Sequence, residues 1–326
     1  MHSRKSYLLI LLSVLFLFLF CFSESFADVI YKQKGSTSGF MGMGNMEMEA
    51  TIMLKGDKQK QESSTKFMGA MAQYMPGGGE QNQMTITRLD KEMIWNIDML
   101  KKTYTEMTFD DMKKMMGMAM AESEKAAEED VEAKVKVDVK KSGQKKKIAG
   151  YECEEFIIKM VAEGKDVMSG ETQEFEVNTH LWVSPKVKGY DQIESFQKKM
   201  AEKMGFEGKY EPGLAQVLTR YGIEAEELTK KMKEIKGLPM LTVVKMKAAG
   251  EAAEVDEEEK AEQKEAMEMA MKMMGKKMEK AEEPEEEGVL MTLTTEITEI
   301  QVKEVTDSEF ELPEGFEKQE VPMHMK

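Results

Sequence analysis

The stretch 148–185 constrains the fold more strongly than any other part of the sequence. Its second half places apolar side chains two residues apart, with acidic or amide side chains between them. That period is typical of a β-strand with one buried side. The first half is another apolar run, and a polar turn at 162–170 separates the two. Two such runs joined by a turn rich in Gly, Asp and Ser predict an antiparallel hairpin.

The same period recurs along much of the chain. Short alternating runs bounded by turn residues predict an antiparallel meander before the hairpin and further strands after it. Glycine-rich stretches at 35–44 and 74–83 are predicted to be loops. The predicted strands outside the hairpin are 29–33, 46–54, 58–67, 84–87, 93–97, 103–107, 133–139, 240–246 and 289–302.

Other stretches have a helical period. Thr108 is predicted to cap the first helix, and Asp110 and Asp111 lie in its first turn. The segment 248–288 is nearly all Ala, Glu, Lys and Met, which predicts a long charged helix inserted into the domain. Apolar residues three and four apart predict amphipathic helices at 108–127, the one capped by Thr108, and at 193–204, 214–221 and 225–235.

Several short motifs resemble a family of uncharacterised secreted bacterial domains that is similar in fold to the outer-membrane lipoprotein carriers. They are Gly150-Tyr151-x-Cys153, Trp182-Val183-Ser184-Pro185, Gly237-Leu238-Pro239 and Phe310-x-Leu312-Pro313-x-Gly315-Phe316. The resemblance implies a half-barrel with a lipid-sized cavity between sheet and helices. Together with the predicted elements, it leads to an α+β class. We expect a strongly curved antiparallel sheet with helices covering its concave face, in one domain at 28–318 with a loose tail at 319–326.

The first 27 residues have the pattern of a secretory signal peptide. A basic start with Arg4 and Lys5 precedes an apolar run at 7–22, and Ser25-Phe26-Ala27 is a small-x-small cleavage site. The alternative is an uncleaved membrane anchor, because the apolar run approaches the length of a spanning helix. Cleavage near Ala27 predicts a periplasmic or secreted protein without stable membrane insertion.

The 326-residue chain carries a formal net charge of −15. Electrostatics therefore argue against binding to nucleic acid. The basic patch Lys145-Lys146-Lys147 nevertheless has the charge to touch a membrane surface. Once the signal is removed, Cys153 stands alone and no internal disulfide forms. Its place in a strand predicts a buried small side chain rather than a reactive thiol.

The sequence has no pattern of a catalytic site, and we expect neither enzyme activity nor a cofactor. It lacks a glycine-rich phosphate loop, a nucleophile elbow and a His, Cys and carboxylate cluster with metal-ligand spacing. His180 alternates with Leu181 in its predicted strand. A general base needs a positioned partner, and the sequence reveals none for His180.

Methionine is unusually abundant, with 34 residues in the chain. Thioethers are soft ligands that suit Cu(I). The closely spaced Met41, Met43, Met46 and Met48, in and beside a glycine-rich stretch, are the candidate ligands. The alternative is that methionine fills the core and lines adaptable apolar surfaces. On the predicted helices the methionines lie on the apolar face, which favours that alternative there.

Three functions remain open, and the leading hypothesis is a non-enzymatic binding protein. It would hold an apolar ligand, a lipid or a lipidated partner in the cavity between sheet and helices. The candidates to line this cavity are Met84, Met93, Met107, Met160, Trp182, Met240 and Met291. The alternatives are a periplasmic Cu(I)-binding protein and an interaction module that acts through the charged insertion.

Overall fold

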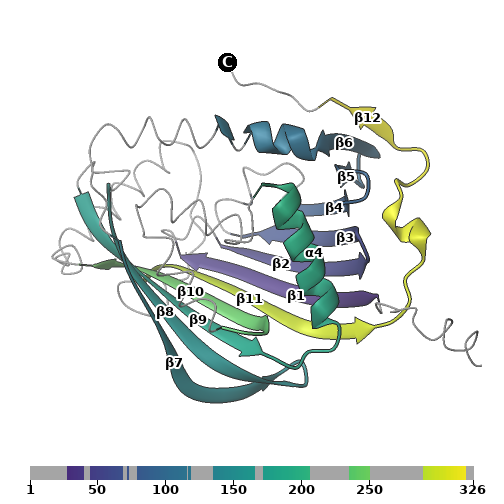
Figure 1. Ribbon diagram of the computed structural model, residues 1–326. Helices are drawn as coiled ribbons and strands as arrows, with labels where there is room; N and C mark the ends of the chain where they lie inside the picture. The colour runs from purple at the N-terminus through teal and green to yellow at the C-terminus, as the bar shows by residue number, and fades with distance from the viewer. Residues whose placement is uncertain are drawn as a thin grey trace, which may run out of the picture.

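Twelve strands form one open sheet in the computed structural model, which describes residues 28–39, 45–68, 72, 79–115, 117–118, 135–165, 172–205, 235–249 and 289–320. The order across the sheet is β12-β6-β5-β4-β3-β2-β1-β11-β10-β9-β8-β7. Two antiparallel meanders, β1–β6 and β7–β11, therefore meet where β1 pairs with β11 (Figure 1). The strands are β1 (Val29–Gly39), β2 (Met46–Lys55), β3 (Lys58–Phe67), β4 (Glu80–Arg88), β5 (Met93–Asp98), β6 (Thr103–Thr108), β7 (Val135–Ile148), β8 (Tyr151–Lys165), β9 (Thr172–Ser184), β10 (Leu238–Ala249), β11 (Val289–Val302) and β12 (Glu317–Gln319).

The alternating pattern predicted most of these strands. The bounds of β3 and β11 are those predicted, and 148–185 contains the predicted hairpin of β8 and β9. Two of the predicted loops are wrong in part, because 35–39 pair with β11 and 80–83 pair with β3. Hydrogen bonds to a neighbouring strand outweigh the low strand propensity of Gly, Ser and Gln in these two stretches.

The predicted α+β class is wrong, because the described part of the chain is mostly sheet. Its helices are α4 (Tyr190–Lys203), the 3-10 helix η2 (Asp307–Phe310) and a helical stretch at 109–115. α4 packs at one end of the sheet, so helices do not cover a concave face. None of the helices in the described ranges is long and apolar enough to cross a membrane.

The predicted long helical insertion is likewise not found among the described residues. Its first two residues, 248–249, belong to β10, because their backbones pair with β9. The rest of the insertion, 250–288, lies outside the described residues. So do the predicted helix at 214–221 and all but the last residue of the one predicted at 225–235.

The capped start predicted at Thr108 is confirmed, since Thr108 Oγ1 accepts a hydrogen bond from the Asp111 amide at 3.1 Å.

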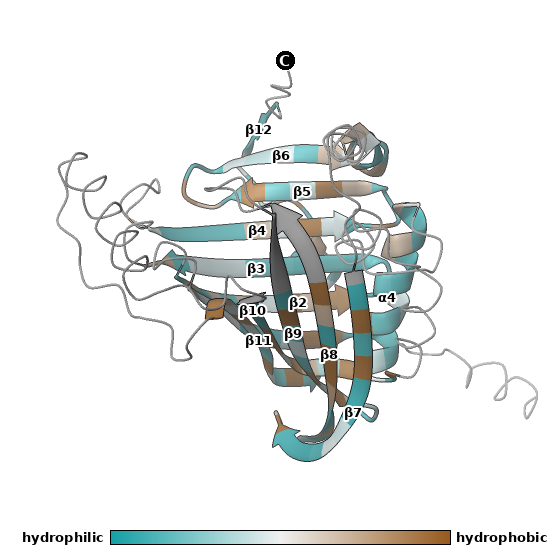
Figure 2. Cartoon of the chain, turned by 90° about the vertical axis from the view of Figure 1, so that its left-hand side faces the viewer, coloured by the Kyte–Doolittle hydropathy of each residue, from teal (hydrophilic) through white to brown (hydrophobic). Residues whose placement is uncertain are grey.

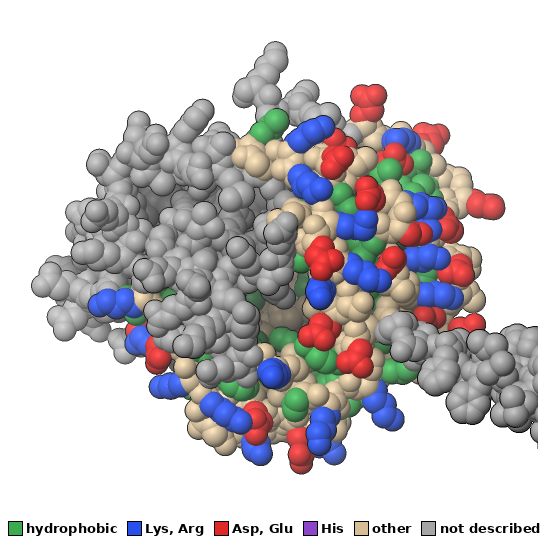
Figure 3. Space-filling model, viewed as in Figure 1, with side chains coloured by type: hydrophobic (Ala, Val, Ile, Leu, Met, Phe, Trp, Pro, Cys, Tyr) green, Lys and Arg blue, Asp and Glu red, His purple; other side chains and the backbone are tan. Residues whose placement is uncertain are grey.

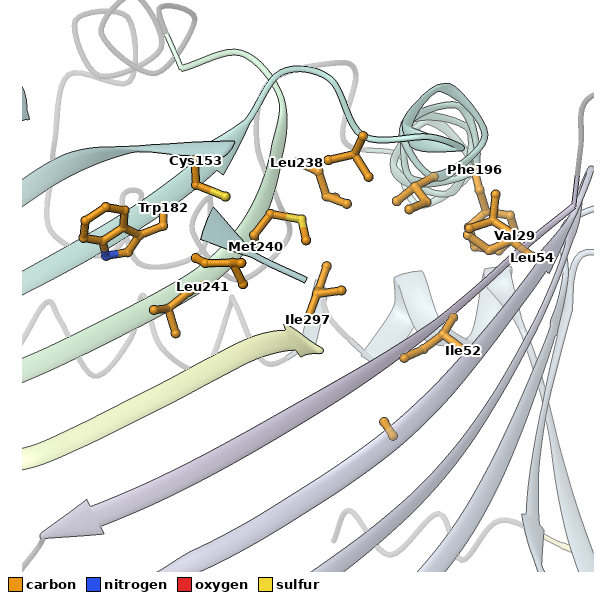
Figure 4. Close-up of a cluster of buried hydrophobic side chains, with 14 of the residues drawn as sticks. Val29, Ile52, Leu54, Cys153, Trp182, Phe196, Leu238, Met240, Leu241 and Ile297 are labelled. Atoms are coloured by element: carbon orange, nitrogen blue, oxygen red, sulfur yellow. The ribbon is translucent and has the colours of Figure 1, made fainter. Parts of the chain in front are cut away.

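α4 confirms the helical period predicted at 193–204, and it packs against one side of the sheet near its end (Figure 1). Its buried Phe196 and Ile193 share a core with Val29 of β1 and with Ile52 and Leu54 of β2. Figure 4 shows Phe196, Val29 and Leu54 next to one another. Apolar burial thus fixes the position of α4 over β1 and β2.

Polar contacts attach α4 to two hairpin turns. Gln192 donates a hydrogen bond to the Gly56 carbonyl at 3.2 Å, and Lys199 pairs with Asp57 at 2.6 Å, both in the β2–β3 turn. Lys203 pairs with Glu92, in the β4–β5 turn, at 2.6 Å. The helix therefore lies along the end of the sheet at which these turns gather.

The C-terminal segment 303–316 covers the opposite side of the sheet. Phe310 is fully buried, and with Val305 it packs against Ile86 of β4 and Trp95 of β5. Met53 also packs there. Because Met53 alternates with Ile52 in β2, this second core and α4 lie on different sides of the sheet. Leu312 and Phe316 of the last family-resembling motif also pack against this second core.

Ion pairs hold this segment against the strands. Lys58 pairs with Asp307, and Arg88, which is 4% exposed, contacts both Asp90 and Glu311. The hydrogen bond from Arg88 lowers the pKa of Asp90. Burial raises the pKa of Glu311, but hydrogen bonds from Arg88 and Lys91 outweigh it, so the net pKa lies below 4.5. These carboxylates stabilise the fold in their ionised form.

We predict that acid loosens the C-terminal segment. A carboxyl group with a lowered pKa in the fold stabilises it above the unfolded pKa, and this stability is lost as the pH falls through the folded pKa. The melting temperature should therefore fall as the pH drops below the ordinary values of 3.8 and 4.5. In Arg88→Gln this acid dependence should be weaker, whatever its melting temperature at neutral pH.

The matched control is Lys34→Gln, which removes an exposed ion pair with Glu49 at 2.8 Å on β1 and β2. Exposed pairs contribute about 0–1 kcal/mol, so this variant should keep the acid dependence of the wild type. Equal pH profiles for Arg88→Gln and the wild type would contradict the assignment.

Glycine is needed for different structural reasons at two positions of the motifs that resemble the family. Both have positive φ, +123° at Gly237 and +89° at Gly150. A Cβ on Gly237 would lie 2.3 Å from the backbone oxygen of Ser184, whereas a Cβ on Gly150 would meet nothing within 4 Å. Gly237 is therefore required by close backbone contact, and Gly150 only by its turn conformation.

We predict that Gly237→Ala is clearly more destabilising than Gly150→Ala. The second variant carries only left-handed strain of about 1 kcal/mol. The first must also move the backbone at Ser184, and we expect a total of about 3 kcal/mol or more. Urea denaturation measures both values. Equal losses would show that the β9–β10 contact does not depend on the glycine.

Candidate functional site

The side of the sheet that carries α4 continues beyond the helix as an apolar surface. Alternate residues of a strand share a side, so Met46 and Met48 of β2 point to the same side as Ile52 and Leu54. Met46 starts a cross-strand row that continues through Thr37, Leu293, Val244, Thr179 and Ile158. Met48 starts a second row through Gly35, Thr295, Thr242, Leu181 and Phe156. A third row joins Met291, Met246, Val177 and Met160.

We call these three rows the apolar face. They contain no charged side chain, and the six strands from β8 to β2 span about 24 Å at the usual strand spacing. Most of the side chains are partly buried, and Leu181 and Thr37 are each 9% exposed. Figure 2 shows the matching bands of alternating hydropathy along β7 and β8.

The reverse side of the same strands is polar. Rows that alternate with the apolar face carry cross-strand ion pairs, among them Lys34 with Glu49 and Lys32 with Glu299, each at 2.8 Å. Lys159 of β8 likewise pairs with Glu176 of β9. The sheet is therefore amphipathic across β8–β2, and its apolar side is the one available to an apolar ligand.

Of the seven residues predicted to line a cavity, the structure brings Met160 and Met291 onto the apolar face, in the same row. Met240 is fully buried in the core beneath α4, at a register shift in β10. Met107 of β6 lies opposite Ile94, a member of that core. The first two thus lie beyond the helix, and the other two lie close to it.

The remaining three do not lie on the apolar face, although Trp182 belongs to the same core as Met240. Met84 and Met93 belong to the second core, with Phe310, on the side opposite to α4. Trp182 alternates with Leu181 in β9 and so does not share its side. The indole is 9% exposed, and Lys146 Nζ lies 4.3 Å from the centre of its ring. No single cavity unites the seven residues.

His180 has a partner that the sequence did not reveal. Its Nδ1 lies 2.8 Å from Oε1 of Glu155, which is 4% exposed. Burial raises the pKa of Glu155, but hydrogen bonds involving Ser142 and His180 outweigh it, so the pKa lies below 4.5. The buried carboxylate thus stays ionised at neutral pH and orients the imidazole.

Cys153 is too far along the strand to act with His180. Cys153 pairs with Lys146 in β7, whereas His180 lies opposite Ile157, four residues further along β8. At about 3.3 Å per residue, the separation is about 13 Å. The thiol and the imidazole therefore do not form a nucleophile–base pair.

Two grooves, of about 420 and 550 Å³, meet at Met84. Lys34, Glu49 and Glu62 line the first, and Tyr104 and Leu100 belong to the second. Most of the other lining side chains are Asn, Gln, Ser or Thr. This polar lining fits an acyl chain less well than the apolar face does.

The predicted Cu(I) ligands are described only in part. Met41 and Met43 lie outside the described residues. Met46 and Met48 lie in β2 on the apolar face rather than in a loop. Across the described ranges, no group of three or more His, Cys, Asp or Glu residues is placed to hold a metal ion. Copper binding remains a prediction.

Several residues of the apolar face were not singled out from the sequence. Val177, Val244, Met246, Leu293 and Ile158 each belong to a run that was predicted as a strand. The two-residue period marks which residues share a side within one strand. It does not give the cross-strand register that aligns the six strands of the face.

The sequence matches no protein-family model. A search of curated proteins finds no match either.

We predict that Cys153 is unreactive in the folded protein. Its side chain is 0% exposed, and burial raises the pKa of the thiol above 9.0. Iodoacetamide reacts with the thiolate, so labelling should be absent in buffer and complete in denaturant. Ser36→Cys, at an exposed position of β1, is the accessible control. Labelling of Cys153 as fast as that of the control would show that β7–β9 open readily.

Proposed function

We propose that the protein binds the hydrocarbon chain of a lipid, a fatty acid or a lipidated partner along the apolar face. The observation that carries this proposal is the continuity of the three rows, two of which cross six strands and the third four, without a charged side chain. The resemblance to lipoprotein carriers implies the same class of ligand. An exported protein would meet such ligands at the cell envelope.

The composition of the face suits acyl chains of varied shape. Met46, Met160, Met246 and Met291 are long, unbranched side chains that repack at low cost. Branched residues such as Val244 give the face a firm centre. Flexible thioethers around a rigid centre favour broad rather than selective recognition.

The expected affinity follows from hydrocarbon burial. Each buried methylene contributes about 0.8 kcal/mol, so ten of them supply about 8 kcal/mol before entropic losses. A long acyl chain offers more methylenes than that and offsets part of those losses. Binding of micromolar class, about −8 kcal/mol, is therefore expected.

The test is displacement of a fluorescent fatty acid, together with native mass spectrometry of protein purified from a bacterial periplasm. Met160→Glu and Met246→Glu place a carboxylate in the third row, and each should weaken binding at least about ten-fold, or about 1.4 kcal/mol. Met99→Glu is the matched control, because Met99 is 42% exposed in the β5–β6 turn. Circular dichroism verifies that each variant is folded.

Absence of co-purifying lipid, together with absence of displacement up to millimolar fatty acid, would overturn the proposal. An equal loss in Met99→Glu would place the binding site away from the apolar face. Neither alternative function is favoured by a contact among the described residues, so both remain predictions.

A further inference from the structure

The last strand of the sheet concentrates positive charge in an acidic protein. β7 is the end strand, and it contains six lysines and one aspartate in 14 residues, a net charge of +5. The whole chain has a formal net charge of −15. We call the lysines the basic edge: Lys136, Lys140, Lys141, Lys145, Lys146 and Lys147, all of which are exposed.

Neighbouring groups neutralise this charge only in part. Lys141 and Lys145 share one carboxylate, that of Glu154. Lys146 lies over the ring of Trp182 and near the Glu155 carboxylate, whose pKa it helps to lower, but it forms no ion pair with the described residues. The other three lysines of the basic edge form no ion pair with the described residues. Figure 3 shows lysine and arginine side chains along the lower-left rim, where Figure 1 places β7.

Protection of the sheet edge explains only part of this cluster. A charged side chain on an end strand prevents pairing with another chain, and a single lysine often suffices. Here lysines follow one another at 145–147 and recur on both sides of the strand. The density matches polybasic segments of four to eight lysines that bind anionic lipid headgroups.

We propose that the basic edge docks the protein on the surface of a bilayer that contains anionic phospholipid. From Lys136 to Lys147 the lysines extend over about 36 Å of the strand, a length that suits an extended surface better than a small-molecule site. Val137 and Val139 alternate with these lysines and are partly buried. Lysine stems reach the headgroups while small apolar side chains lie at the acyl boundary.

This docking does not depend on acyl-chain binding at the apolar face. Its strength comes from the charge of β7, whereas ligand binding comes from the rows of β8–β2. The two proposals are therefore separated by measuring vesicle binding and fatty-acid displacement on the same preparations.

The experiment is co-sedimentation of the full chain, after signal removal, with vesicles of phosphatidylcholine alone or mixed with phosphatidylglycerol. Binding should require phosphatidylglycerol and should be lost at high salt. The triple variant Lys136→Gln, Lys140→Gln, Lys147→Gln should bind about a hundred-fold more weakly, because each lysine near an anionic membrane contributes a factor of about five. Its fatty-acid displacement should be unchanged.

The matched control is the triple variant Lys101→Gln, Lys113→Gln, Lys114→Gln, which removes the same charge from exposed positions elsewhere. This control should keep its vesicle binding. Equal binding to neutral vesicles, or an equal loss in both variants, would overturn the proposal. So would binding to polyglutamate without binding to vesicles, because that would identify an acidic protein as the partner.

Discussion

The sheet is continuous because β1 pairs with β11, and the rest of the structure depends on this contact. It joins the first strand of the chain to the last long one, since Val29 lies opposite Val302. A loop of this length makes the pairing entropically costly. Burial compensates for that cost, because Val29 is fully buried and Ile297 is 6% exposed. We infer that the two meanders form locally and that their junction completes the fold.

α4 and the C-terminal segment, which pack on the two sides of the sheet, both begin at this junction. The turn before α4 packs on it, and a Cβ on Gly189 would lie 2.5 Å from Val29 and 3.3 Å from Val302. On the other side, the carboxylate of Asp28 accepts a hydrogen bond from the amide of Val305 at 2.8 Å, where the C-terminal segment starts. One end of β7–β10 belongs to the core beneath α4, through Cys153, Trp182 and Met240. The rest of these strands extends beyond that core, where their apolar side chains are partly buried.

The sequence predicted where most strands lie, but it did not predict which side of the sheet each side chain faces. β3 is almost entirely polar, so its position followed from the Gly56-Asp57 turn and from pairing with the run before it rather than from alternation. The side on which Met84 or Trp182 lies depends on cross-strand register and on bulges such as that at Met240. A one-residue shift moves a side chain to the other side of the sheet. Residue pattern alone therefore could not separate the apolar face from the second core.

The basic edge and the apolar face, the two proposed binding surfaces, meet at β7. On an anionic surface, a chain of charge −15 with a positive edge experiences a field that turns β7 toward the membrane. Screening limits this field to about 10 Å at moderate ionic strength, so distant acidic segments do not cancel the attraction of lysines in contact. Val139, opposite Ile158, extends a row of the apolar face to the same strand. An acyl chain leaving the bilayer at β7 would therefore meet a row of uncharged, mostly apolar side chains from β7 to β2.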